Sequence, residues 1–451
     1  MYSLRRFGII LGLDTISSIL KTLGNPQEAF SCIHVAGSNG KGSIASALST
    51  ILTKAGKRVG LYTSPHLVRF NERICINSTP VTDAQVIEAH EAVRKAAAPG
   101  REPTFFEYTT AMAFYLFARE TVEWAVIETG MGGRMDATNV VSPALSIITN
   151  ISLEHQAYLG KTIPEITYEK AGIIKPKTPV ITGVRRPAAM DVLTRVAAEK
   201  KAPMFRLGAD FRIRRQKDGT FTYFGMEHTW PGMKTGLLGR HQAENSAMAL
   251  AACELLKARD LEIPEETLRK GLSENRWPGR LEIVSRDPFV ILDGAHNRAA
   301  VRNLAGFLAE RFPKKNILLV LGILDDKPYR VMLKTLLPVV RRVILTRAAI
   351  DRALPTQTLL EYAKTLCRDI DVIEPAGKAL GHAVATAGSD EVICVAGSLY
   401  VVGTAGSDEV ICVAGSLYVV GDVKAAIEND PSMLQRPAQN QFKIDSPAVL
   451  S

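Results

Sequence analysis

Short apolar runs alternate with amphipathic stretches along the first half of the chain, a pattern typical of strands connected by helices. Apolar runs predict strands at 30–36, 58–62, 124–127 and 144–149, and helical periodicity predicts helices at 14–23, 44–55, 82–98 and 104–119. Thr82 stands where it can cap the third of these helices. Strands that alternate with helices form right-handed βαβ units, so we expect a mainly parallel sheet with helices on its faces.

The pattern changes in the second half of the chain. Alternating residues over 212–230, centred on Asp218 and Gly219, predict a hairpin. Helices are expected at 242–256, 264–272 and 423–428, and a second series of strands at 290–292, 317–321, 342–345 and 371–373. Pro278 and Gly279 mark a link between the two halves. We therefore predict an α/β protein of two domains: 1–280, with a phosphate-loop type, mostly parallel sheet flanked by helices, and a smaller, Rossmann-like 281–430. A loose tail, 431–451, follows.

An internal repeat interrupts the second domain. Residues 386–403 (TAGSDEVICVAGSLYVVG) recur without a single change at 404–421. True structural repeats diverge and come in several copies, so this pair indicates a tandem duplication rather than a stacking unit. Each copy contains one apolar run, at 391–396 or 409–414, that can form the last strand of the domain. The second copy leads directly into the expected last helix, so we expect it to take that position.

Composition narrows the class of protein. The 451 residues are 46% hydrophobic and 22% charged, values ordinary for a globular protein, and no apolar run approaches the roughly 20 residues of a membrane span. The six cysteines form no C-x-x-C pair, which indicates reduced thiols and a cytoplasmic location. The net charge of +9 comes from scattered Lys and Arg residues without a basic block, which suits anionic small molecules better than nucleic acid.

The stretch between the first expected strand and its helix carries the clearest chemistry. Residues 34–43 have the sequence HVAGSNGKGS, in which Gly37 and Gly40 allow the backbone N–H groups to surround an anion. The helix start and Lys41 add positive charge, and Ser43 can reach a phosphate-bound Mg²⁺. The spacing departs from the standard phosphate loop G-x-x-x-x-G-K-[ST], since Gly42 stands between the lysine and the serine. The alternative is a glycine-rich turn without a ligand.

Other polar residues follow the ends of expected strands, where parallel sheets bind ligands. Glu128 comes after the strand at 124–127 and His155 after the strand at 144–149, so both could hold Mg²⁺. Taken singly, Glu128 could equally form a salt bridge, His155 could be structural, and Lys170 could be a solvated helical lysine. The segment 293–297 (DGAHN) follows the first strand of the second domain, and its alternative is a polar turn that caps a helix.

Together these segments resemble the folylpolyglutamate synthase/dihydrofolate synthase family of the ATP-dependent Mur ligase superfamily. The resemblance covers roughly residues 12–428 and is carried by HVAGSNGKGSIA, TSPHLVRFNERI, FFEYTTAMAF, ETGMGGRMDATN, SLEHQAYLG, EKAGIIK, GRHQAENSAMA, NRWPGRLE, LDGAHN and AGSLYVVG. It implies a Mur ligase-like fold with an ATP-binding first domain and a ligase second domain. The family has one copy of AGSLYVVG, so the duplication is a departure from its pattern.

The resemblance also implies roles for individual residues. ATP contacts are implied for Gly37, Ser38, Asn39, Gly40, Lys41, Gly42, Ser43, Asn245, Arg280 and Asp293. Mg²⁺ ligands are implied for Ser43, Glu128 and His155, substrate contacts for Thr63, Ser64, Pro65 and Asp136, and catalytic roles for Lys41, Lys170 and His296. Lys170 matches a lysine that is carbamylated by CO₂ in relatives. Asp136 matches a position near the pterin in members that use dihydropteroate.

The function implied is an ATP-dependent ligase that adds L-glutamate to dihydropteroate, to folates, or to both, through an acyl phosphate. We expect a monomer that binds these small molecules and neither nucleic acid nor membranes. Another Mur-superfamily amino-acid ligase is an alternative, although the phosphate loop begins too early to leave room for a preceding substrate-nucleotide domain. A nucleotide-switch ATPase is a second alternative, which leaves the segment 293–296 unexplained. A nucleic-acid-binding protein is the third.

Overall fold

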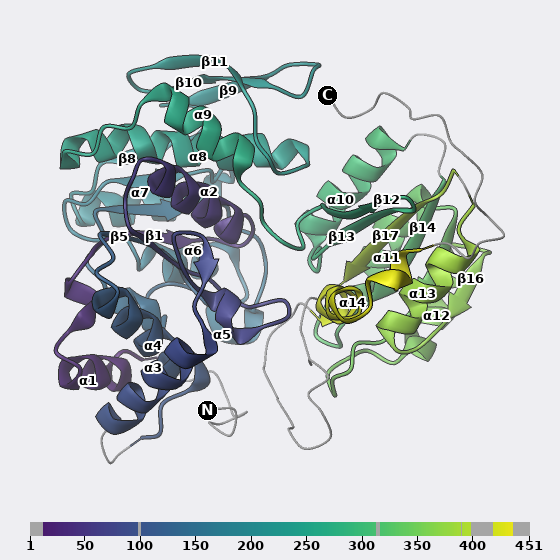
Figure 1. Ribbon diagram of the computed structural model, residues 1–451. Coiled ribbons are helices and arrows are strands. Elements are labelled where there is room, and N and C mark those ends of the chain that lie inside the picture. The colour runs from purple at the N-terminus through teal and green to yellow at the C-terminus, as the bar shows by residue number, and fades with distance from the viewer. Residues whose placement is uncertain (1–11, 98–100, 313–315, 389, 398–417, 436–451) are drawn as a thin grey trace. The chain divides into compact units, whose positions relative to one another are not determined.

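The computed structural model describes residues 12–97, 101–312, 316–388, 390–397 and 418–435 (Figure 1). The chain forms two compact units. Unit 1 comprises Met1–His66 and Phe70–Trp277, and unit 2 comprises Leu67–Arg69 and Pro278–Ser451. Within the described ranges, none of the helices combines the length and the apolar character that a membrane span requires.

Unit 1 is built on an eight-stranded sheet in the order β4-β3-β2-β5-β1-β6-β7-β8. Its strands are β1 (Ser31–Ala36), β2 (Val59–Tyr62), β3 (Ile74–Ile76), β4 (Thr79–Pro80), β5 (Trp124–Glu128), β6 (Leu145–Ile148), β7 (Val180–Thr182) and β8 (Met204–Arg206). All neighbouring pairs are parallel except β2–β3 and β3–β4. The predicted mainly parallel sheet is therefore confirmed. Strand β1 lies between β5 and β6, and its residues are buried from Cys32 onward.

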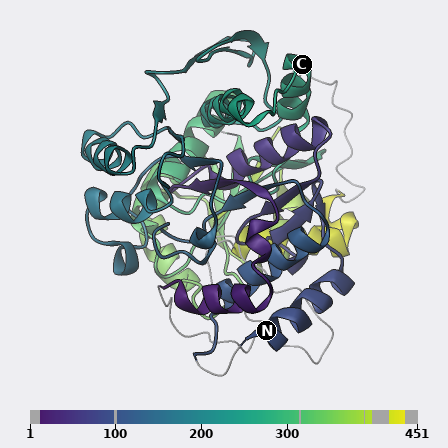
Figure 2. The same ribbon diagram turned by 90° about the vertical axis from the view of Figure 1, so that its left-hand side faces the viewer.

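Helices cover both faces of this sheet (Figures 1 and 2). They are α1 (Asp14–Thr22), α2 (Lys41–Lys54), α3 (Asp83–Ala96), α4 (Phe105–Arg119), α5 (Gln156–Leu159), α6 (Ile163–Ala171), α7 (Pro187–Glu199), α8 (Arg240–Leu256) and α9 (Glu265–Glu274). Alternate residues of β1 point to opposite faces. Ile33 and Val35 belong to the core formed with α2, α8 and α9, whereas Cys32 belongs to the core formed with α1, α3 and α4. Fully burying an aliphatic side chain contributes roughly 1.5–3 kcal/mol, so these cores fix the position of β1.

The starts of the helices differ in a way that bears on function. Helix α3 begins with a capping box between Thr82 and Gln85, which confirms the predicted cap, and α4 and α6 begin in the same way. Helix α2 begins after Gly40, which has a left-handed backbone and makes no side-chain cap. The first-turn N–H groups of α2 are thus not satisfied by a capping side chain, as a helix that receives an anion requires.

A small antiparallel sheet of three strands packs against helix α8. Its strands are β9 (Arg212–Arg215), β10 (Phe221–Phe224) and β11 (Thr229–Met233). The hairpin predicted around Gly219 corresponds to β9 and β10. The sequence did not predict the third strand as such, because Pro231 and Gly232 interrupt it and both residue types are depleted in strands.

Unit 2 is a second α/β layer structure with the strand order β12-β13-β17-β14-β15-β16. Its strands are β12 (Glu282–Arg286), β13 (Phe289–Asp293), β14 (Ile317–Gly322), β15 (Arg342–Leu345), β16 (Ile370–Val372) and β17 (Val392–Gly397), and its helices are α10 (Arg298–Arg311), α11 (Tyr329–Leu336), α12 (Thr356–Ala363), α13 (Ala376–Thr386) and α14 (Tyr418–Asn429). All neighbouring pairs are parallel except β12–β13. The two-domain α/β fold with mostly parallel sheets is confirmed; β12 was not predicted.

The first copy of the duplication forms the central strand β17, which pairs with β13 on one side and β14 on the other. The prediction that the second copy takes this position is wrong. The two copies are identical, so local sequence could not choose between them. The first copy follows α13 after only a short link, which favours it for the strand. The apolar run of the second copy, at 409–414, lies outside the described residues.

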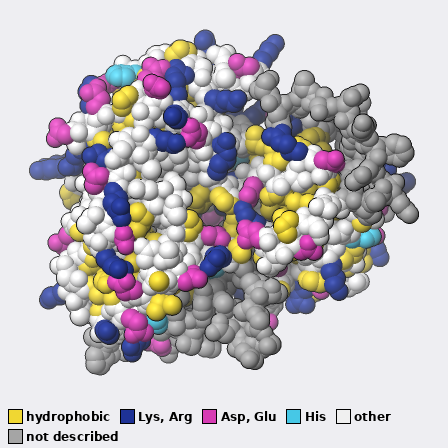
Figure 3. All heavy atoms as spheres, in the orientation of Figure 1, with side chains coloured by type: hydrophobic (Ala, Val, Ile, Leu, Met, Phe, Trp, Pro, Cys, Tyr) yellow, Lys and Arg dark blue, Asp and Glu magenta, His cyan; other side chains and the backbone are white. Residues whose placement is uncertain are grey.

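Both signs of charge are interspersed on the face of the molecule shown in Figure 3. Lys and Arg side chains alternate there with Asp and Glu rather than forming a continuous basic patch. This distribution agrees with the scattered basic residues of the sequence.

A variant without residues 404–421 tests the effect of the duplication. Between β17 and α14 the deletion leaves Ser398 and Leu399, and Tyr400 to Gly403 replace the identical residues at the start of α14. A shorter connection costs less closure entropy, so we expect the free energy of unfolding to rise by about 2 kcal/mol. Urea and thermal unfolding measure this change. An unchanged or lower melting temperature would contradict the expectation.

Candidate functional site

The segment HVAGSNGKGS spans the end of β1, the turn at residues 37–40 and the first residues of α2. Gly37 has a φ of +143°, and a Cβ built on it would lie 1.9 Å from the Oγ1 atom of Thr149. Gly40 has a φ of +86°, and a Cβ there would lie 2.7 Å from the Oδ1 atom of Asn245. Both positions therefore require glycine, for conformation as well as for space.

Residues that follow β6 hold this loop in shape. The backbone N–H of Ser38 donates to the carbonyl of Asn150 (2.9 Å), and that of Asn39 donates to the Asn150 side chain (3.0 Å). The Thr149 hydroxyl donates to the Asn39 carbonyl (2.6 Å), and the backbone N–H of Ser152 donates to the Ser38 hydroxyl (2.9 Å). These hydrogen bonds therefore fix the conformation of the loop. Thr149 and Asn150 were not among the site residues predicted from the sequence.

Three predicted site residues meet at the carboxyl end of the sheet. The Nζ atom of Lys41 lies 3.7 Å from the Oε1 atom of Glu128, the last residue of β5, and both side chains are mostly buried. The backbone N–H of Ser64 donates to the Oε2 atom of the same carboxylate at 3.4 Å. Thr63, which is buried, is held by its N–H bond to the carbonyl of Arg73 (3.0 Å). Glu128 thus connects the phosphate loop with the segment 63–65, which also contains Pro65.

Ser43, in the first turn of α2, is linked to Asn245 of α8 through the side chain of Gln242. The amide of Gln242 donates to the Ser43 hydroxyl at 3.4 Å and accepts from the amide of Asn245 at 2.8 Å. All three side chains are buried. Since Asn245 also lies against Gly40, helix α8 supplies one wall of the loop.

Lys170 is the most deeply buried charged group of the site, with 2% of its side chain exposed. Its Nζ atom lies 2.8 Å from Glu154 and donates to the Gly37 carbonyl at 3.0 Å. Burial lowers the pKa of Lys170, and the nearby Glu154 opposes this shift. For Glu154, burial would raise the pKa, but the positive charges of Lys170 and Lys41 outweigh it and hold the pKa at about 2. Glu154 is therefore ionised and is the counter-ion of Lys170.

Glu154 was not among the site residues predicted from the sequence, although it stands next to His155 in the segment SLEHQAYLG. The need of a buried lysine for an acidic partner could have identified Glu154. A lysine at a buried helical position needs an acidic partner, and Glu154 is an acid that follows the end of β6.

The predicted magnesium ligands supply suitable donors for a hard cation. Glu128 offers a carboxylate and Ser43 a hydroxyl, while His155 is exposed and has a left-handed backbone at the start of α5. The buried hydroxyls of Thr129 and Ser152 have no hydrogen-bond partner within the part of the chain that the structure describes. In that part, no group of three or more His, Cys, Asp or Glu side chains is arranged to hold a metal. The donors thus fit Mg²⁺ only if water or phosphate oxygens complete its coordination.

Asp136 is occupied by its own loop. Its carboxylate accepts hydrogen bonds from the backbone N–H groups of Met131 (2.8 Å) and Thr138 (3.1 Å) and from the Thr138 hydroxyl. Burial raises its pKa, against these hydrogen bonds. The carboxylate therefore shapes the segment 131–138, which limits what it can offer to a substrate.

The predicted residues of unit 2 lie at the end of β13. Asp293 is buried and accepts hydrogen bonds from the N–H groups of Leu281 (2.9 Å) and Ala295 (3.0 Å). Burial raises its pKa to about 6, although the positive charge of Arg280 opposes the shift. The Nδ1 atom of His296 lies 2.8 Å from the Gly294 carbonyl, which can only accept. Nδ1 therefore carries a proton, so the lone pair lies on Nε2 when the ring is neutral.

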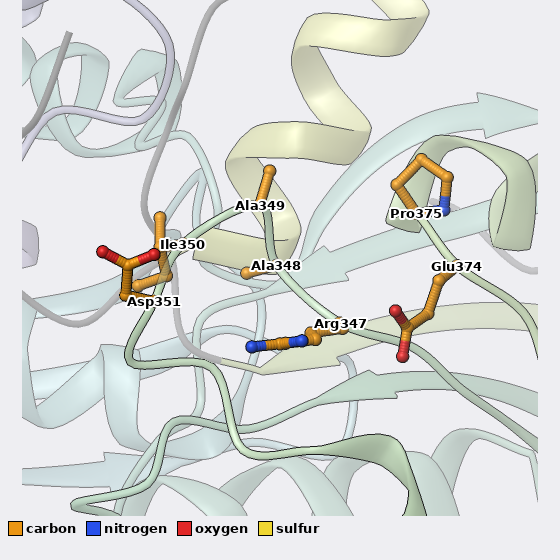
Figure 4. A pocket seen from close by; sticks show the side chains of 7 residues that line it. All are labelled: Arg347, Ala348, Ala349, Ile350, Asp351, Glu374 and Pro375. Carbon is orange, nitrogen blue, oxygen red and sulfur yellow. The ribbon is translucent and has the colours of Figure 1, made fainter. Parts of the chain in front are cut away.

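Unit 2 also contains a cavity of about 420 Å³ (Figure 4). It is lined by Arg347, Ala348, Ala349, Ile350, Asp351, Glu374 and Pro375, from the loops that follow β15 and β16. None of the site residues predicted from the sequence lines this cavity.

The chain matches known protein families, curated relatives and solved structures. The Mur ligase middle domain matches residues 35–253, and the Mur ligase glutamate ligase domain matches residues 279–399. The chain is 36% identical over 414 residues to the dihydrofolate synthase/folylpolyglutamate synthase of Bacillus subtilis, covering 88% of this chain and 94% of that one. Among solved structures, it is similar to Escherichia coli FolC in complex with DHPP and ADP (TM-score 0.84, 30% identity, 95% and 96% of the two chains). It is also similar to the folylpolyglutamate synthase of Thermotoga maritima (TM-score 0.80, 34% identity, 95% and 96%).

Replacing Glu154 by Gln tests its role as counter-ion. The change leaves the buried Lys170 charge without compensation, so we expect the free energy of unfolding to fall by about 3 kcal/mol. Urea unfolding measures this, with Glu91→Gln as the control, because Glu91 pairs with Arg94 on an exposed helix surface. A second change, Lys170→Met, should restore part of the stability lost in Glu154→Gln. If Glu154→Gln is as stable as Glu91→Gln, Glu154 is not the counter-ion.

Proposed function

The chain belongs to the folylpolyglutamate synthase/dihydrofolate synthase family of Mur ligases, and from this premise we propose that it joins L-glutamate to dihydropteroate, to a folate, or to both, using ATP. The observation that carries the proposal is the position of Lys41, at the uncapped start of α2 and 3.7 Å from Glu128. The loop offers an anion site, and the carboxylate beside it offers a ligand for the cation that accompanies ATP.

The reaction follows from the inertness of a carboxylate toward an amine. An oxygen of the substrate carboxylate attacks the γ-phosphorus of ATP, ADP leaves, and an acyl phosphate forms. The amine of L-glutamate then attacks the acyl carbon, phosphate leaves, and the nitrogen loses a proton as the amide forms. Gly37, Ser38, Asn39, Gly40 and Gly42 would surround the phosphates, and Lys41 would stabilise the charge on the transferred group.

Ser43, Glu128 and His155 would hold Mg²⁺, which supplies positive charge to the phosphate oxygens when it is bound. Lys41 lies in the position of a counter-ion to Glu128. Asn245 and, in unit 2, Arg280 and Asp293 are the other residues that we assign to the nucleotide.

His296 is our candidate acceptor for the proton of the attacking amine. In the neutral ring, the Nδ1–H bond to the Gly294 carbonyl places the lone pair on Nε2, which is the tautomer that a general base requires. On the family resemblance we assign Thr63, Ser64 and Pro65 to the folate substrate. The backbone N–H of Ser64 donates to Glu128, which supports a position of this segment beside the phosphate loop. Asp136 would act on the pterin through the loop that it shapes.

The structure has Lys170 as the unmodified lysine, paired with Glu154; we also propose that in the active enzyme CO₂ carbamylates it, which replaces this ion pair. A lysine reacts with CO₂ only as the free amine, and burial lowers the pKa of Lys170, which increases the fraction of that form. A bound carbonyl resonance from ¹³C-bicarbonate that disappears in Lys170→Met would support the assignment. An identical resonance in both proteins would exclude it.

The remaining assignments concern the whole chain. We propose that residues 1–280 and 281–430 act as the ATP-binding and ligase domains, that the enzyme is a monomer with small-molecule partners only, and that it acts in the cytoplasm, where ATP is available.

The proposed activity is tested with ATP, Mg²⁺ and L-glutamate, together with dihydropteroate or a reduced folate, and with mass analysis of the product. We expect ADP release that depends on glutamate and a product heavier by one glutamate residue. Lys41→Ala should abolish this ADP release, because the charge that stabilises the phosphoryl group is lost. Lys257→Ala, an exposed lysine of unit 1, is the matched control and should retain turnover.

Normal turnover in Lys41→Ala would refute the role of the loop. ADP release that needs neither glutamate nor folate would instead indicate a nucleotide-switch ATPase.

A further inference from the structure

The last residues of unit 1 are attached to the phosphate-loop helix. Helix α9 ends at Glu274, and the next residue, Asn275, is buried. Its Oδ1 atom accepts hydrogen bonds from the hydroxyls of Ser46 (2.6 Å) and Thr50 (3.4 Å), which lie one turn apart on α2. The Ser46 hydroxyl also approaches the Arg276 carbonyl at 3.3 Å. The chain segment that leaves α9 is therefore fixed along α2.

This attachment places Trp277 against the first turn of α2. A Cβ built on Gly42 would lie 2.8 Å from the Nε1 atom of the Trp277 indole and 3.0 Å from two of its ring carbons. The indole is partly buried and packs against the core formed with α2, α8 and α9. Gly42 follows Lys41 directly and is the residue that departs from the standard phosphate-loop spacing. Its missing side chain is what leaves room for the indole.

Trp277 also stands at the boundary between the two units in the sequence. Trp277 is the last residue of unit 1, and unit 2 resumes at Pro278. Gly279 and Arg280 follow immediately, and Arg280 is one of the residues assigned to the nucleotide. The indole contact thus joins the first turn of α2 to the residue that directly precedes the link.

We propose that Trp277 is a positioning residue for the nucleotide: its indole, held by the Asn275 anchor, fixes Gly42 and the first turn of α2 in the geometry that accepts the phosphates. Nucleotide binding in turn changes the environment of the indole. The inference deepens the proposed function, because it rests on ATP binding at this loop.

Tryptophan fluorescence tests the inference directly, because the chain has three tryptophans. Trp124 begins β5 and Trp230 stacks on Tyr223 in the small sheet, so neither adjoins the loop. We expect ADP with Mg²⁺ to change the emission of the wild type and to leave that of Trp277→Phe unchanged. The double variant Trp124→Phe/Trp230→Phe should keep the full change. An ADP-dependent change of emission that persists in Trp277→Phe would overturn the claim that nucleotide binding changes the environment of the indole.

Binding and kinetics test the positioning role. Trp277→Ala should weaken ADP binding about tenfold and raise the KM for ATP, while the KM for glutamate stays unchanged. Trp277→Phe, which keeps a ring over Gly42, should recover most of the affinity. If Trp277→Ala instead lowers the melting temperature and changes the KM values for ATP and glutamate alike, the side chain has only a structural role. That result would contradict the positioning role.

A double-mutant cycle isolates the contact itself. Gly42→Ala should weaken ADP binding in the wild type, because the new methyl group displaces the indole, and should have a smaller effect in the Trp277→Ala background. If Gly42→Ala weakens ADP binding equally in both backgrounds, the contact between Gly42 and the indole does not contribute to ADP binding. If calorimetry finds that the wild type binds ADP and Trp277→Ala binds it equally well, the inference alone fails. A wild type that does not bind ADP refutes the proposed function and the inference with it.

Discussion

The burial of one ammonium group constrains most of the candidate site. Lys170 is almost completely removed from solvent, and a buried charge is tolerated only when it is paired and hydrogen-bonded. Its two partners come from different parts of unit 1: the Glu154 carboxylate from the segment after β6, and the Gly37 carbonyl from the phosphate loop. The pairing therefore fixes the end of α6, the end of β6 and the first glycine of the loop relative to one another.

The close approach of these segments explains several residue types in the neighbourhood. A Cβ on Gly133 would lie 2.8 Å from the Lys170 carbonyl, and one on Gly172 would overlap the backbone of Arg134. The segment 130–139 is thus pressed against the end of α6, where Asn139 donates to the carbonyls of Arg134 (3.0 Å) and Gly172 (3.1 Å). Glycines in ETGMGGRMDATN and EKAGIIK allow this contact, and the contact keeps Lys170 in the interior.

The sequence predicted features that depend on short-range patterns. The parallel sheets, the capping of α3 by Thr82 and the placement of the phosphate loop between β1 and α2 all follow from periodicity and local spacing. It did not predict Glu154 or the Asn275 anchor, because both depend on which side chains meet after long loops. It also chose the wrong copy of the duplication for β17, since identical segments carry identical local information. The resemblance supplied residue roles, whereas the structure supplied the contacts that can explain them, such as the indole of Trp277 against Gly42.

The central claim is that the phosphate loop serves to activate a carboxylate for attack by glutamate. The most direct measurement uses a dihydropteroate or folate substrate whose reacting carboxylate carries ¹⁸O on both oxygens. Mass analysis of the phosphate released during a glutamate-dependent turnover then reports the path of the oxygen. The account predicts one ¹⁸O atom in each phosphate, transferred through the acyl phosphate, and one retained in the new amide. Unlabelled phosphate would show that ATP is hydrolysed by water and would contradict the account.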